Sequence, residues 1–151
     1  MKKLIDWAAK THQQAVQILP INDTTITHTW MDSYPYNSIS IYAFHPMYID
    51  LNQLGKMKDK EALAVFEARR QELNALPQID YEAVNNAKRA YLKVMFQQTG
   101  RKVLASDEFK RFFEENEHWL LPYAAFSYLR DLYGTPDFSQ WPEHTEYKAE
   151  E

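Results

Sequence analysis

Cysteine is absent from the 151 residues, which excludes disulfide frameworks, thiolate chemistry and cysteine-type zinc sites. The chain has no run of about 18 apolar residues, so we expect neither a transmembrane helix nor a membrane partner. It has no dense cluster of lysine and arginine, and its formal net charge is −4, which argues against nucleic-acid binding. The first apolar stretch is interrupted by Asp6 and Lys10, so we expect no signal peptide and a cytoplasmic location.

Aromatic residues, by contrast, make up 15% of the sequence, and they cluster rather than scatter. The clearest cluster is DSYPYNSISIYAFHP, residues 32–46, which sets Tyr34, Tyr36, Tyr42 and Phe44 among small polar residues. The segment is too broken for a helix and too irregular for a regular strand. We therefore predict an aromatic loop here.

The first third of the chain has the pattern of a helix followed by a strand. Residues 2–12 have helical spacing of apolar side chains, with one buried face. Residues 15–21, AVQILPI, are short and β-branched and predict a strand buried on both faces of a parallel sheet. The other strand candidate is SISIYAF, residues 38–44. A lone buried strand cannot satisfy its backbone groups, so either the chain self-associates or the rest of the sheet belongs to a larger protein.

The remainder is dominated by helical patterns. We predict helices over residues 56–76, 80–100, 107–119 and 122–134. Asp80 and Ser106 are expected N-caps, and Gly100 and Gly134 are expected to end helices. Pro122 is tolerated because it lies near the start of the last helix.

Two motifs, far apart in the sequence, carry a family resemblance. The first is QILPIND…SYPYNSISIYAFHPMYIDL, with matching positions at Gln17, Leu19, Pro20, Pro35, Tyr36, Ser38, Ser40, Pro46, Ile49 and Leu51. The second is WLLPYAAFSYLRDLYGTPDFSQWPEH, with matches at Trp119, Leu120, Tyr123, Ala124, Phe126, Leu129, Trp141, Pro142 and Glu143. Together they resemble the 4-alpha-glucanotransferases of glycoside hydrolase family 77.

This sequence departs from the family pattern at four places, as a divergent branch would. Asn22-Asp23 stands where the family usually has Gly-Pro, and the extra TITHTWMDSY makes the following loop longer. Asn37 replaces a glutamine, and Pro122 replaces an acidic residue.

The resemblance implies a mainly α fold: a fragment of a (β/α)8 TIM barrel, with one helix and an early strand, plus a helical insertion subdomain. The expected boundaries are 1–49 for the partial barrel unit with its substrate-side loop, 50–134 for the insertion subdomain, and 135–151 for a turn-rich tail. The aromatic loop would then follow the C-terminal end of a barrel strand, where the active sites of such barrels lie.

The resemblance also implies a function. The family transfers α-1,4-glucan segments between maltodextrins by a retaining double displacement, with an aspartate nucleophile and a glutamate acid/base. Those carboxylates are expected outside these 151 residues, so we assign no catalytic residue and expect the chain alone to be inactive. Tyr36 is the expected glucan contact, with Pro35, Asn37 and Ser38 shaping its turn, because aromatic rings suit the apolar faces of sugars. No cofactor is implied.

Each candidate also has a plainer interpretation. Tyr36 can be an ordinary packing residue, and Trp119 and Trp141 are more typical of core anchors than of partner contacts. The acidic cluster at Glu114, Glu115 and Glu117 is typical of a solvated helix face, and the five histidines lack metal-ligand spacing. The alternative function is a free-standing helical carbohydrate-binding or protein-interaction module.

Overall fold

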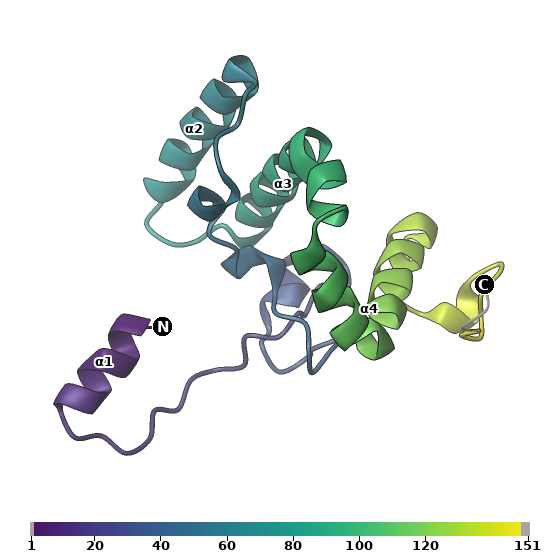
Figure 1. The fold of residues 1–151 in the computed structure, drawn as a ribbon, viewed down its shortest axis with the longest axis horizontal. Coiled ribbons are helices and arrows are strands. Elements are labelled where there is room, and N and C mark those ends of the chain that lie inside the picture. Colours follow the sequence, from purple (N-terminus) through teal and green to yellow (C-terminus); the bar gives the residue numbers. More distant parts are fainter. Residues whose placement is uncertain (1, 149–151) are drawn as a thin grey trace.

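The structure is a computed structural model that describes residues 2–148 (Figure 1). It contains four α-helices: α1 (Lys2–Lys10), α2 (Lys60–Asn74), α3 (Tyr81–Leu104) and α4 (Asp107–Tyr133). Short 3-10 turns lie at Trp30–Ser33, Pro46–Tyr48, Leu51–Leu54 and Phe138–Gln140. Over residues 2–148 no β-strand forms, and the isolated antiparallel bridge between Asn22 and Phe44 is the one β-type pairing. The expectation of a mainly α chain is confirmed.

The predicted caps at the start of α3 and at both ends of α4 are confirmed. The Asp80 side chain accepts the backbone N–H of Ala83, and Ser106 accepts that of Phe109. Gly134 closes α4 with φ of 68°, a left-handed conformation that glycine adopts without steric cost. These ends are local in sequence, since each cap contacts a residue three or four positions away.

Three predicted helix boundaries are wrong. α2 begins at Lys60, after the cap Asp59, rather than at residue 56. α3 does not stop at Gly100 but continues to Leu104, and Gly100 is buried beneath the ring of Phe96, which would lie 2.8 Å from an added Cβ. The helices expected over 107–119 and 122–134 are one helix, α4, with Pro122 inside it. Proline removes one helical hydrogen bond, but good helix formers on both sides carry the helix through.

The N-terminal part extends away from the rest of the chain (Figure 1). In α1 the buried side chain is that of Ala8, and Val16, Ile18 and Leu19 in the following segment are 43%, 43% and 61% exposed. The prediction of a buried strand over 15–21 is therefore wrong for this structure, because no neighbouring strand is present within residues 2–148 to pair with it. The TIM-barrel assignment stays a prediction.

The folded body is built around α3. α2, α4 and the turns of residues 30–54 all contact this helix. Tyr81 and Met95 on α3 are buried, and Trp141 is 6% exposed beneath the rings of Phe126 and Tyr133. Trp141 is thus a core residue, as predicted. None of the helices within 2–148 is long and apolar enough to cross a membrane.

Candidate functional site

The loop predicted over residues 32–46 overlaps a longer segment, Asp23 to Ala43, which is named the aromatic loop from here on and is closed at its base by backbone hydrogen bonds. The Asp23 N–H donates to the Ala43 carbonyl at 2.9 Å, and the Ile39 N–H donates to the Asp23 carbonyl at 2.8 Å. Two residues beyond each end of the loop, the His45 N–H donates to the Ile21 carbonyl at 3.0 Å. The two ends of the loop are therefore held together although they are distant in sequence.

The four predicted substrate-binding residues share one turn at the surface of this loop. The Tyr36 side chain is 63% exposed, and its ring centroid lies 5.5 Å from that of Tyr34, which is 60% exposed. The Asn37 N–H donates to the Tyr34 carbonyl at 3.4 Å, and Asn37 and Ser38 are exposed while Pro35 is half-buried. The structure thus brings these residues together on the surface. Their contact with a ligand stays a prediction.

Asp32 organises the first half of the loop from within. Its carboxylate accepts the backbone N–H of Thr27 at 3.0 Å and that of His28 at 2.7 Å. Its carbonyl oxygen accepts the hydroxyl protons of Thr24 and Tyr81, and Asp32 is 4% exposed. These bonds hold the backbone of His28 in a left-handed conformation with φ of 61°, which residues other than glycine adopt infrequently.

A hydrogen-bonded chain connects this loop to α3. His45 Nδ1 accepts the Met47 N–H at 3.0 Å, so Nε2 carries the ring proton and donates to the Tyr81 hydroxyl at 2.7 Å. The Tyr81 hydroxyl in turn donates to the Asp32 carbonyl at 2.9 Å. Burial lowers the pKa of His45, against the opposing charges of Asp23 and Asp32, and burial raises the pKa of Tyr81. Burial therefore disfavours the charged form of both side chains.

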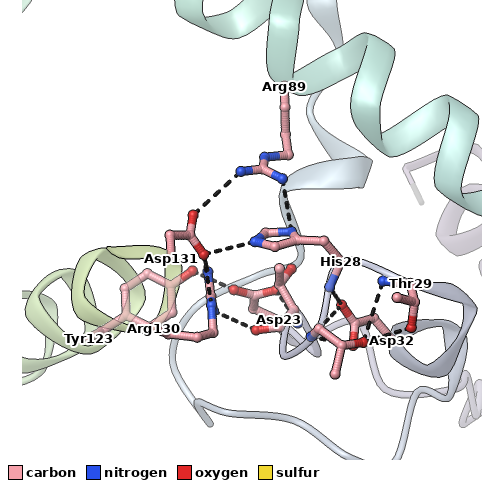
Figure 2. Close-up of polar contacts among 10 residues, drawn as sticks. Asp23, His28, Thr29, Asp32, Arg89, Tyr123, Arg130 and Asp131 are labelled. Atoms are coloured by element: carbon pink, nitrogen blue, oxygen red, sulfur yellow. Dashed lines mark hydrogen bonds and ion pairs between the residues drawn. The ribbon is translucent and has the colours of Figure 1, made fainter. Parts of the chain in front are cut away.

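Asp23 makes the matching connection to α4 (Figure 2). This residue is 2% exposed, and its carboxylate accepts the Thr25 N–H at 2.9 Å, the Thr25 hydroxyl at 2.6 Å and the Tyr123 hydroxyl at 2.6 Å. Burial raises the pKa of Tyr123, and the bond to Asp23 raises it further. Arg130, 5% exposed, donates to the Thr25 carbonyl from the same helix.

His28 completes the attachment between the two helices (Figure 2). Arg89 of α3 donates to His28 Nδ1 at 2.9 Å, so Nε2 carries the proton and donates to Asp131 of α4 at 2.8 Å. Asp131 also pairs with Arg130 at 2.8 Å. Burial alone would raise the pKa of Asp131, but the bonds from His28 and Arg130 bring it below its ordinary value.

A groove runs beside the same loop. It lies between residues 38–42 and α4 and has a volume of about 530 Å³. Tyr42 stacks on Trp119, with ring centroids 5.5 Å apart and planes 18° apart, while His118 meets the edge of Tyr42. Trp119 is therefore partly buried against the loop and does not lie in the main core.

The acidic side chains around the loop are either hydrogen-bonded or exposed to solvent. The carboxylates of Asp23 and Asp32 are both occupied by donors of the loop and of α4. Glu114, Glu115 and Glu117 are exposed on α4, as expected of a solvated face. Among the residues that the structure describes, no cluster of His, Cys, Asp or Glu could hold a metal ion.

Sequence reasoning missed the polar network that fixes the loop. The sequence analysis named Tyr123 as a motif match and Asp23 as a departure from the family pattern, but it predicted no interaction among the members of the network: Asp23, His28, Asp32, His45, Tyr81, Arg89, Tyr123, Arg130 and Asp131. One signal was available, because Asn22-Asp23 departs from the family pattern and immediately precedes the lengthened loop.

Comparison with known proteins gives a consistent result. The family model described as 4-alpha-glucanotransferase matches residues 1–151. The chain is 40% identical to the 4-alpha-glucanotransferase DPE2 of Oryza sativa subsp. japonica, covering 99% of the chain and 16% of that protein. It is 31% identical to the 4-alpha-glucanotransferase of Chlamydia pneumoniae, covering 93% of the chain and 26% of that protein. The chain thus spans about a quarter or less of the length of these two relatives, and no solved structure matches it.

Proposed function

Because the chain belongs to glycoside hydrolase family 77, the 4-alpha-glucanotransferases, we propose that it is part of an enzyme that transfers α-1,4-glucan segments between maltodextrins. The family match over residues 1–151 supports this proposal, as do the plant and bacterial relatives described above, both of which are 4-alpha-glucanotransferases. In this proposal the chain contributes the glucan-binding loop and the helices that hold it.

The exposed pair of Tyr34 and Tyr36 carries the binding part of the proposal. Two neighbouring rings, 60% and 63% exposed, present apolar faces and phenolic hydroxyls on one turn. Sugar rings offer apolar C–H faces together with hydroxyl groups, so such a turn matches both features of a glucan. Asn37 and Ser38 add hydrogen-bonding groups at the same exposed turn.

The chemical step is proposed to be a retaining double displacement. One carboxylate attacks the anomeric carbon while a second protonates the leaving oxygen, and a second sugar then takes the glycosyl group from the covalent intermediate. We place both carboxylates in polypeptide outside residues 1–151. The occupied state of Asp23 and Asp32 supports that placement, because neither carboxylate is free to act as a nucleophile or an acid.

The test replaces Tyr36 in the complete enzyme, meaning the polypeptide that joins these residues to the catalytic carboxylates. Tyr36→Ala should lower kcat/KM for maltotriose by at least about tenfold, which corresponds to roughly 1.4 kcal/mol of transition-state binding. Tyr128→Ala is the matched control, since Tyr128 is 67% exposed on α4, outside the aromatic loop. If the two variants have the same kinetics as the parent enzyme, Tyr36 does not bind glucan.

A further inference from the structure

We propose that Asp23 and Tyr123 form a positioning pair, which fixes the place of Tyr36 relative to α4 and thereby sets how well the loop binds glucan. The inference rests on the proposed function of Tyr36. Neither residue of the pair needs to touch the sugar. Asp23 is 2% exposed, and the Tyr123 hydroxyl is engaged by Asp23.

The backbone of Asp23 connects the two sides of the loop. Its N–H donates to the Ala43 carbonyl and its carbonyl accepts the Ile39 N–H. Ile39 lies three residues after Tyr36, and Ala43 ends the loop. A displacement of Asp23 is therefore passed directly to the segment that carries Tyr36.

The side chain of Asp23 connects this base to α4. The Tyr123 hydroxyl, 2.6 Å from the Asp23 carboxylate, is the donor that α4 provides to it, while the other two donors belong to Thr25 of the loop itself. The raised pKa of Tyr123 keeps its hydroxyl protonated and able to donate over the ordinary pH range. A buried carboxylate that loses one donor must move toward another donor or toward water, because leaving it unsatisfied is costly.

Both connections depend on groups that not every residue has. A proline at position 23, for example, would have neither a backbone N–H for the Ala43 carbonyl nor a carboxylate for the Tyr123 hydroxyl.

The experiment is a double-mutant cycle between Tyr123 and Tyr36 in the complete enzyme. Tyr123→Phe keeps the ring and removes the hydroxyl, and it should lower kcat/KM for maltotriose about fivefold, mainly through KM. In the Tyr36→Ala background the same change should have less than about a twofold effect, because the pair acts through Tyr36. Tyr128→Phe, which removes a hydroxyl from an exposed position on the same helix, should leave the kinetics unchanged.

The outcomes separate the possible explanations. If Tyr123→Phe lowers thermal stability but leaves kcat and KM unchanged, the bond is only structural and the proposal is overturned. The proposal is also overturned if Tyr123→Phe has the same effect in both backgrounds. If Tyr36→Ala alone has no effect, the proposed function of Tyr36 fails, which is a distinct result. Asp23→Asn is the second variant, because the asparagine side chain cannot accept hydrogen bonds from all three donors. It should lower kcat/KM for maltotriose as Tyr123→Phe does, and the effects of the two substitutions should not add when they are combined.

Discussion

The sharpest stability prediction concerns Asp32, the buried carboxylate inside the aromatic loop. Asp32→Asn keeps the size of the side chain but leaves a single oxygen that can accept. In the native chain the two carboxylate oxygens receive the N–H of Thr27, the hydroxyl of Thr27 and the N–H of His28. The amide NH2 of asparagine would therefore face a backbone donor instead of accepting from it.

The expected magnitude follows from these contacts. A hydrogen bond to a charged acceptor contributes roughly 1.5–3 kcal/mol, and at 4% exposure Asp32 has little water to replace a lost partner. We expect Asp32→Asn to lower the free energy of unfolding by about 2–3 kcal/mol.

Urea unfolding followed by far-UV circular dichroism measures this change, and amide hydrogen exchange of Thr27 and His28 should accelerate by at least about tenfold. Asp59→Asn is the control, because Asp59 caps α2 at an exposed position and asparagine is an equally good N-cap. If the two variants differ by less than about 0.5 kcal/mol, Asp32 does not hold the loop and the reasoning is refuted.

Three further predictions concern the buried His45, the exposed apolar residues of segment 15–21 and the activity of the 151-residue chain alone. Burial lowers the pKa of His45 below its unfolded value of about 6.5, so the unfolded chain binds the proton more readily and stability is lost as the pH falls below about 6.5. His45→Gln should reduce this loss in urea titrations at several pH values, whereas His118→Gln, at an exposed position, should not. The exposed Val16, Ile18 and Leu19 should drive self-association of the chain. Sedimentation equilibrium should therefore show dimers, and Leu19→Lys should weaken the association of these dimers. A strict monomer at high micromolar concentration would contradict that expectation. The 151-residue chain alone should not convert maltotriose into glucose and longer maltodextrins, and activity in a preparation free of host enzyme would disprove it.

The aromatic loop shows how far the sequence could be taken toward the candidate site. The motif around Tyr36 identified both the family and the turn, and the structure places that turn at the surface. The anchors beneath it were not predictable in the same way. His28 meets Asp131, which is 103 positions away in the sequence, and Asp23 meets Tyr123, which is 100 positions away. No local periodicity encodes such pairs.

Features that depend on near neighbours in the chain could be predicted from the sequence. The helical character of α2, α3 and α4, and the caps at Asp80, Ser106 and Gly134, follow from side chains that act within one turn of their own backbone. The same locality explains the errors at Gly100 and Pro122, since a weak helix former does not end a helix when the residues around it favour continuation.

What each segment packs against could not be predicted in this way, because it depends on the three-dimensional path of the chain. AVQILPI has the composition of a buried strand, but burial requires a partner on each side, and within residues 2–148 none is present. Asp23 and Asp32 lie in a segment whose composition is typical of an exposed loop. The fold nevertheless surrounds both carboxylates with hydrogen-bond donors and buries them. Burial depends on the path of the whole chain, because the groups that cover a residue come from elements far from it in sequence.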